Sequence, residues 1–298
     1  MMEHGFVSGF AAIVGRPNVG KSTLLNRFIG QKVAIVSDKP QTTRNRIVGV
    51  YHGPEAQVVF LDTPGVHKPR HRLGEYMMKV ATEAWSEVDC ILFVVDAAAG
   101  IGGGDQFVAE RVHRVGTPII LALNKCDLLR SEHVLEALAK SSELGDFHAV
   151  FPLSAETGDN VPELLAAIVG LMPSGPRYFP EGMITDRPEE FVIAELIREQ
   201  ILHHTREEVP HSVAVVTEEF EEGVSDDVVH IRARIHVERK SHKGIIIGKQ
   251  GSMLKAIGTA ARQEIEALLG SRVYLDLHVR ASEGWRDRPA LLQRLGYL

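Results

Sequence analysis

One eight-residue stretch constrains this chain more than any other: it reads Gly15-Arg16-Pro17-Asn18-Val19-Gly20-Lys21-Ser22 and fits the phosphate-binding pattern G-x-x-x-x-G-K-[ST]. An apolar run at 10–14 predicts a buried strand before it, and residues 22–29 predict a helix after it. Glycines let backbone N–H groups turn toward an anion, and a helix N-terminus adds partial positive charge. We expect Lys21 to reach the β- and γ-phosphates, Ser22 to bind Mg²⁺, and Thr23 to complete the loop. The alternative is a glycine-rich turn without a ligand.

Length and composition set wider bounds. A chain of 298 residues suggests two domains, and the net charge of −6 gives no whole-protein signal for nucleic acid. Cys90 and Cys126 have no metal-ligand spacing, which predicts a reducing compartment and no disulfide. The sequence contains no signal-peptide pattern and no apolar run of about 18 residues. These features predict a soluble, cytoplasmic protein.

Strand-like and helical patterns alternate up to residue 172, which predicts an α/β domain over 1–172 with a mostly parallel sheet and helices on both faces. Residues 47–51 are predicted to pair antiparallel with 57–61. The other expected strands are 11–14, 90–95, 119–122 and 150–152, and the expected helices are 22–29, 74–87, 104–115, 131–143 and 162–169.

A segment with three prolines, 173–182, interrupts this alternation and is predicted to be a linker. The remainder, 183–298, has a different order and predicts a smaller α+β domain. Its expected elements are a helix at 189–207, strands at 211–220 and 227–239, two helices around 248–251 of which the second runs to about 269, and a strand at 272–280.

Two further motifs follow strands of the first domain. Asp62-Thr63-Pro64-Gly65 offers a carboxylate for Mg²⁺ and a backbone N–H for the γ-phosphate. Asn124-Lys125-Cys126-Asp127 offers the ionised carboxylate of Asp127, which can accept two hydrogen bonds from the N1 and N2 groups of guanine but not from adenine. We expect Asn124 to tie this loop to the phosphate loop and the Lys125 stem to lie over the base.

A third segment, Ser154-Ala155-Glu156, would complete the base pocket. The Ala155 N–H is expected to face the guanine O6, and Glu156 to have little effect because the backbone does the recognition.

Together and in this order, these motifs make residues 6–172 resemble the small GTPase superfamily. The resemblance implies a Mg²⁺-dependent guanine-nucleotide switch that hydrolyses GTP. It places Gln41, Thr42 and Thr43 in a mobile first switch, where we prefer Thr43 to Thr42 as the Mg²⁺ ligand because it directly precedes Arg44.

One position departs from many members of the superfamily. Val66 stands where they carry a glutamine that orients the attacking water, and a valine cannot form that hydrogen bond. This implies slow hydrolysis without a further element. Asn18 resembles the asparagine with which some relatives bind K⁺, so we hold K⁺ stimulation as a hypothesis.

The second domain contains the loop Gly248-Lys249-Gln250-Gly251 between two expected helices. A G-x-x-G loop can clamp the backbone of about four nucleotides, and its surrounding element order resembles a type II K-homology (KH) domain. Between residues 228 and 262 there are eight basic residues and one acid, Glu238, so the local charge is +7. The expected RNA-binding residues are Arg239, Lys240, Lys243, Ile246, Ile247, Gly248, Lys249, Gln250, Gly251 and Ser252. Trp285 either adds to this surface or packs the chain end.

A GTPase domain, a short linker and a type II KH domain, together with Gln41-Thr42-Thr43-Arg44 and Asp62-Thr63-Pro64-Gly65-Val66-His67, resemble the Era family of bacterial ribosome-assembly GTPases. The resemblance implies binding near the 3′ end of small-subunit ribosomal RNA, controlled by the nucleotide, and a role in maturation of the 30S subunit. It also implies contact with the inner membrane surface; we expect a monomer and no DNA partner.

Three alternatives remain open. The chain could be an RNA-binding assembly factor that holds GTP structurally with negligible hydrolysis. It could be a related GTPase that acts on tRNA or on the large subunit, although such proteins usually carry domains that 183–298 do not show. An ATPase conflicts with Asp127.

Overall fold

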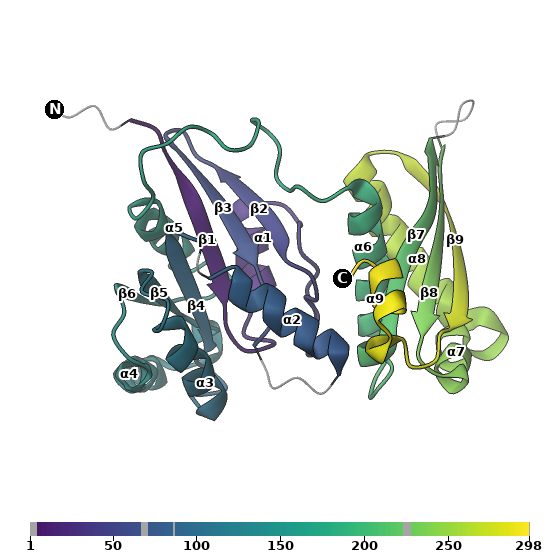
Figure 1. Cartoon of the computed structure of the whole chain (residues 1–298), viewed down its shortest axis with the longest axis horizontal. Helices are drawn as coiled ribbons and strands as arrows, with labels where there is room; N and C mark the ends of the chain where they lie inside the picture. Colours follow the sequence, from purple (N-terminus) through teal and green to yellow (C-terminus); the bar gives the residue numbers. More distant parts are fainter. Residues whose placement is uncertain (1–4, 67–70, 86, 223–227, 298) are drawn as a thin grey trace. The chain divides into compact units, whose positions relative to one another are not determined.

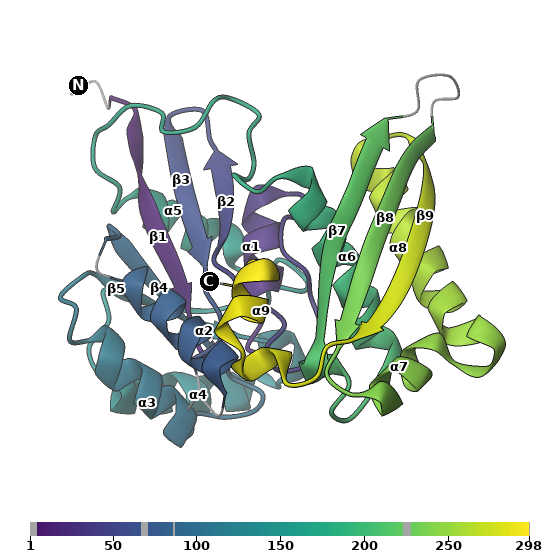
Figure 2. The same cartoon turned by 45° about the vertical axis from the view of Figure 1, so that its right-hand side comes forward.

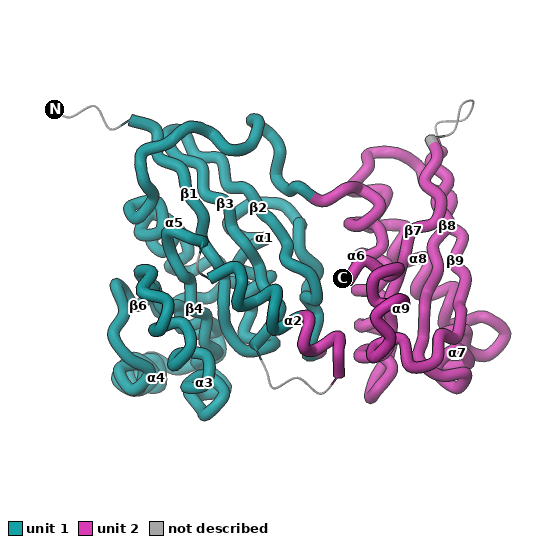
Figure 3. The backbone as a smooth tube through the Cα atoms, viewed as in Figure 1, with its two compact units in different colours: residues 1–36, 40–69, 77–186 teal, residues 37–39, 70–76, 187–298 magenta. Residues whose placement is uncertain are grey.

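The computed structural model describes residues 5–66, 71–85, 87–222 and 228–297. His67, which the sequence places in the second switch, and residue 227, the expected start of a strand, lie outside these ranges. The chain divides into two compact units, one formed by residues 1–36, 40–69 and 77–186 and the other by residues 37–39, 70–76 and 187–298 (Figure 3).

The first unit contains a six-stranded sheet with the strand order β2-β3-β1-β4-β5-β6 (Figure 1). All neighbours pair in parallel except β2 and β3, which form the predicted antiparallel hairpin. Every residue of β3 and β4 is buried, because helices cover both faces of the sheet. The strands are β1 (Val7–Val14), β2 (Ile47–His52), β3 (Ala56–Asp62), β4 (Cys90–Asp96), β5 (Ile119–Asn124) and β6 (Ala149–Pro152).

The helices of this unit alternate with the strands, as the sequence predicted. They are α1 (Lys21–Ile29), α2 (Arg72–Glu83), α3 (Gly103–Val112), α4 (Ser131–Ser141) and α5 (Val161–Val169), with short 3₁₀ turns η1 (Cys126–Leu128) and η2 (Ser142–Leu144). The first part of α2, residues 72–76, is assigned to the second unit. The predicted α/β class with a mostly parallel sheet is confirmed.

A row of polar side chains crosses one end of this sheet. Ser8, Gln57 and His52 stand opposite one another on β1, β3 and β2. Each bonds to the backbone of the segment 173–184: Ser8 Oγ donates at 2.6 Å, Gln57 Oε1 accepts at 2.7 and 3.0 Å, and His52 Nε2 lies 2.9 Å from a carbonyl oxygen. The segment predicted as a linker is therefore docked on the first unit; its role between domains stays a prediction.

The second unit is built on the three-stranded sheet β7-β8-β9, in which β7 pairs antiparallel and β9 parallel with β8. Helices α6 and α8 lie on one face of it (Figure 2). The predicted order of elements is confirmed, and α9 was not predicted. The elements are α6 (Glu189–His204), η3 (Pro210–Ser212), β7 (Val213–Glu222), β8 (Val228–Val237), α7 (Lys240–Ile247), η4 (Lys249–Gly251), α8 (Ser252–Leu269), β9 (Arg272–Ala281), η5 (Trp285–Asp287) and α9 (Pro289–Arg294).

Trp285 packs the C-terminal end of the chain. Its side chain is fully buried, its Nε1 donates to the carbonyl of Ser212 at 3.0 Å, and its ring stacks on Tyr297. This favours the packing alternative over an RNA contact. None of the helices in the described ranges combines the length and hydropathy that a membrane crossing needs.

Candidate functional site

The phosphate loop lies between the end of β1 and the start of α1, as predicted. Its lysine is buried within the loop: Lys21 is 6% exposed, and its Nζ donates to the carbonyls of Arg16 at 2.8 Å and Gly15 at 3.3 Å. The first turn of α1 adds backbone N–H groups that no helical carbonyl can satisfy. The loop therefore has the form of an anion site with an ammonium group at its centre.

Three predicted Mg²⁺ ligands meet beside it. Ser22 Oγ and Thr43 Oγ1 lie 3.0 Å apart, and both donate to Oδ2 of Asp62, at 2.8 and 3.2 Å. The other carboxylate oxygen, Oδ1, is buried and has no hydrogen-bond partner among the described residues. Two hydroxyls and an unsatisfied buried carboxylate oxygen are the donor set that a hard divalent cation prefers, so these residues fit Mg²⁺. The preference for Thr43 over Thr42 agrees with this geometry.

Burial shifts the pKa values of the two opposite charges at this corner. It lowers the pKa of Lys21 to about 8, although the Asp62 carboxylate acts against this shift. It raises the pKa of Asp62, against the effects of Lys21 and of the Ser22 and Thr43 hydroxyls. Each charge is thus removed from water without full compensation by its neighbours. A bound phosphate group would compensate the ammonium group of Lys21, and a bound cation would compensate the carboxylate of Asp62.

The second switch contacts the phosphate loop through its backbone. The Val66 N–H donates to the carbonyl of Gly15 at 3.1 Å, while the Val66 side chain is 3% exposed and packs in the core. Val66 therefore has neither the chemistry nor the orientation to position a water molecule. Thr63 is structural, because its hydroxyl donates to the carbonyl of Ile13 at 2.9 Å.

Asn124 connects three segments of the site. Its Nδ2 donates to the carbonyl of Val19 at 2.8 Å, and its Oδ1 accepts from the Ala155 N–H at 2.8 Å. The predicted tie between the base loop and the phosphate loop is present. The Ala155 N–H, however, bonds to Asn124 in this structure, which corrects the prediction that it faces the guanine O6.

The guanine-reading residue itself is accessible. Asp127 is exposed in η1, and its carboxylate makes no hydrogen bond to any described residue. Beside it, Lys125 Nζ donates to the carbonyl of Asn18 at 2.9 Å. The structure therefore presents Asp127 to a ligand and fixes its neighbour to the phosphate loop.

Sequence patterns missed three residues of this site. Arg27 on α1 donates to the carbonyls of Ala155 and Glu156 and so supports the third base segment. Asp96 pairs with Lys125 at 2.6 Å, and Asp105 pairs with Arg16 at 2.8 Å. Only Asp96 gave a signal, because it ends a buried strand as Asp62 does.

The G-x-x-G loop of the second unit lies between α7 and α8, as predicted. Gly248 has φ +72°, and a Cβ there would lie 2.7 Å from the Cβ of Met253, so only glycine fits. Lys249 and Gln250 are exposed at the tip of the loop. The loop can therefore offer its backbone and the ammonium group of Lys249 to a phosphodiester.

One predicted RNA contact is corrected. Ile246 is fully buried, because it lies on the face of α7 that packs into the core of the second unit. Ile245, one residue earlier on the helix, is 48% exposed. An RNA strand beside α7 would therefore touch Ile245 and not the side chain of Ile246.

The charges of this unit are sorted by the two faces of the sheet. Arg232 and Arg234 alternate with buried residues of β8, so they point away from the helices, and they pair with Glu219 and Glu218 of β7. They do not belong to the loop surface. The acid Glu238 pairs with Arg286. The exposed cations on the loop side are Arg239, Lys240, Lys243, Lys249 and Lys255, together with Arg262, which pairs with Glu266.

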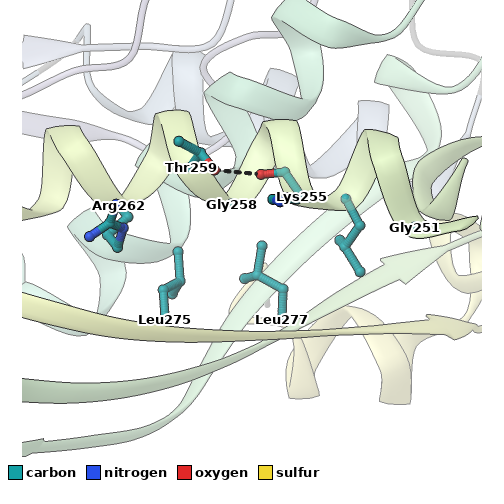
Figure 4. Close-up of a pocket in the computed structure, with 8 residues that line it drawn as sticks. Gly251, Lys255, Gly258, Thr259, Arg262, Leu275 and Leu277 are labelled. Carbon is teal, nitrogen blue, oxygen red and sulfur yellow. Dashed lines mark hydrogen bonds between the residues drawn. The ribbon is translucent and has the colours of Figure 1, made fainter.

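A pocket of about 380 Å³ continues from this loop along α8. Leu275 and Leu277 project from β9 toward α8, whose Lys255, Gly258 and Arg262 face them (Figure 4). An apolar floor with cations at its rim suits an unstacked base and its phosphates. The sequence did not predict this pocket, because it depends on the parallel pairing of β9 with β8.

The lowered pKa of Lys21 implies that nucleotide binding depends on pH. Bound phosphates favour the ammonium form, so binding above pH 8 must be accompanied by proton uptake, and affinity must fall as the pH rises through the value of about 8. Calorimetry of GDP binding in buffers of different ionisation enthalpy should show uptake of most of a proton at pH 8.5 and of about 0.1 proton at pH 7. The titration is made in EDTA, because a divalent cation that displaced a proton from Asp62 would mask the proton uptake at Lys21. No uptake at pH 8.5 would contradict the buried lysine.

Two family models match this chain: one described as "50S ribosome-binding GTPase" over residues 10–125, and a KH domain model over residues 208–286. GTPase Era of Alkaliphilus oremlandii is 53% identical over 98% of this chain and 99% of its own length, and GTPase Era of Alkaliphilus metalliredigens is 51% identical with the same coverage.

Solved structures agree with these relatives. A crystal structure of Era in complex with MgGDPNP and nucleotides 1506–1542 of 16S ribosomal RNA has a TM-score of 0.95 and 41% identity, and covers 98% of this chain and 99% of its own. A point variant of Aquifex aeolicus Era bound to GDP·AlF₄⁻ gives a TM-score of 0.94 at the same identity and coverage. The nucleotide-site motifs, the KH domain and this full-length similarity agree: the chain belongs to the Era family of GTPases.

Proposed function

We propose that this chain hydrolyses GTP as a switch in the maturation of the small ribosomal subunit, binding the 3′ end region of its ribosomal RNA through residues 183–298. The observation that carries the proposal is the presence, in one chain, of a guanine-nucleotide site and a cationic G-x-x-G surface that continues into a base-sized pocket. The Era structure that is similar to this chain over nearly its whole length holds MgGDPNP and nucleotides 1506–1542 of 16S ribosomal RNA. Residues 1–172 would form the GTPase domain and 173–182 the linker.

Two cations belong to the proposal. Ser22, Thr43 and Asp62 would hold Mg²⁺, which neutralises charge on the β- and γ-phosphates when bound. Exposed Asn18, at the tip of the phosphate loop, would hold K⁺ in the position where an arginine finger acts in other GTPases. The burial of Val66 supports this, since Val66 cannot orient the attacking water and hydrolysis therefore needs a further element.

The alternatives are less well supported. A factor with purely structural GTP gives no reason for a full GTPase site, and relatives that match nearly the whole chain are called GTPase Era. The cytoplasmic location and the monomeric state stay predictions from the sequence, and contact with the inner membrane surface stays a prediction from the resemblance.

The pocket on α8 allows a direct test of RNA binding. Gly258→Leu should fill the pocket, because a Cβ at this position already lies 3.3 Å from Leu277. We expect affinity for a fluorescein-labelled single-stranded RNA, matching the 3′ end of small-subunit ribosomal RNA, to fall about tenfold or more. Ala256→Leu adds a larger side chain on an exposed part of the same helix and should leave affinity within about twofold. Equal affinities for the two variants would exclude the pocket as the base site.

Potassium dependence tests the role of Asn18. GTP turnover in the presence of RNA should be about tenfold higher in KCl than in NaCl of equal concentration, because a positive charge placed at the reacting phosphates stabilises the transition state. Asn18→Ala should reduce the rate in KCl to that in NaCl. Equal rates of the wild type in both salts would remove the K⁺ proposal.

A further inference from the structure

Two carboxylates frame the loop that joins β4 to α3. Asp96 is the last residue of β4, and Asp105 lies in the first turn of α3. Asp96 is 8% exposed and Asp105 is fully buried. Neither belongs to a nucleotide-binding motif of the sequence, and a buried carboxylate is costly unless hydrogen bonds compensate it. Their partners therefore indicate what they do.

Asp105 anchors the phosphate loop. Its Oδ1 accepts from Arg16 Nε at 2.8 Å, and its Oδ2 accepts from the Gly102 N–H at 2.9 Å, so one carboxylate holds both the Arg16 side chain and the start of α3. A Cβ at Gly104 would lie 2.4 Å from Arg16 Cδ, so a larger residue there would displace the Arg16 side chain from its present position. The backbone carbonyl of Arg16 accepts from Lys21 Nζ at 2.8 Å, which is shorter than the bond of this lysine to the Gly15 carbonyl. The ion pair thus fixes the residue that positions the phosphate-binding lysine.

Asp96 anchors the base-recognition loop. Its Oδ2 lies 2.6 Å from Lys125 Nζ, and its Oδ1 accepts from the Ala99 N–H at 2.9 Å. The same ammonium group donates to the carbonyl of Asn18 in the phosphate loop. Lys125 therefore lies between a carboxylate on one side and the phosphate loop on the other.

We propose that Asp96 and Asp105 are positioning residues and that the loop between them is a bridge which sets the base-recognition loop and the phosphate loop at the separation a guanine nucleotide requires. Neither carboxylate contacts the nucleotide; Asp96 acts through Lys125 and Asp105 acts through Arg16. The proposal rests on guanine-nucleotide binding at this site and adds to it the residues that hold its two halves in register.

The test measures dissociation of a fluorescent GDP analogue from the full chain in Mg²⁺. Asp96→Asn and Asp105→Asn keep side-chain size but remove the charge, and each should raise the dissociation rate about tenfold. If both carboxylates hold the same loop, the double variant should release the GDP analogue more slowly than expected from multiplying the rate increases of the two single variants. Glu110→Gln removes an exposed carboxylate from the same helix α3 and should match the wild type.

A second cycle separates positioning from folding. Arg16→Gln and Asp105→Asn should each accelerate dissociation, while the double variant should be no faster than the faster single variant, because Asp105 acts through Arg16. Melting of the nucleotide-free variants reports stability independently. The bridge would be overturned if variants that melt at a lower temperature than the wild type still released the GDP analogue at the wild-type rate. It would also be overturned if the effects of Asp96→Asn and Asp105→Asn on the dissociation rate multiplied fully in the double variant. Absence of GDP binding by the wild type would overturn the nucleotide assignment together with it.

Discussion

The nucleotide site depends on one constraint: the carboxyl ends of parallel strands meet at the same edge of a sheet. β1 ends just before Gly15, β3 ends on Asp62, β4 on Asp96 and β5 on Asn124. Parallel pairing sets these ends side by side, with Asp96 directly opposite Asn124. Groups far apart in sequence are thereby brought within hydrogen-bond distance, and the apolar strands supply the rigidity that keeps them there. The polar groups of this edge compensate the buried charges of the site in part, and burial still shifts the pKa values of Lys21 and Asp62.

The second unit uses a sheet in a different way, to separate charges. Alternation along β8 directs Arg232 and Arg234 to the face without helices, where acids of β7 pair with them. The cations that remain for a phosphodiester are those on α7, the G-x-x-G loop and α8. A chain with net negative charge can in this way present a positive surface to RNA, whose affinity depends on local and not on total charge.

Much of the fold and of the nucleotide site could be predicted from the sequence. The same physical reasons explain which residues the sequence analysis missed or misplaced. Buried parallel strands are continuous apolar runs, and the phosphate and guanine motifs have fixed chemistry, so both were predictable. Asp105 and Gln57 were not, because their importance arises from packing and register that no local pattern encodes. Ile246 was assigned to the RNA surface because three consecutive isoleucines do not show which one faces the core. The Ala155 N–H was misplaced because Asn124 can compete for it.

We expect the RNA surface and the GTPase site to act as one switch. The most direct measurement is GTP turnover with and without a short single-stranded RNA matching the 3′ end of small-subunit ribosomal RNA, for the wild type, Lys249→Glu and Lys140→Glu. Both lysines are exposed, but only Lys249 lies in the G-x-x-G loop, whereas Lys140 lies on α4 of the first unit. We expect RNA to accelerate turnover by the wild type and by Lys140→Glu, whereas Lys249→Glu should keep its basal rate but lose the acceleration. An RNA response that is absent from the wild type, or unchanged in Lys249→Glu, would contradict this expectation.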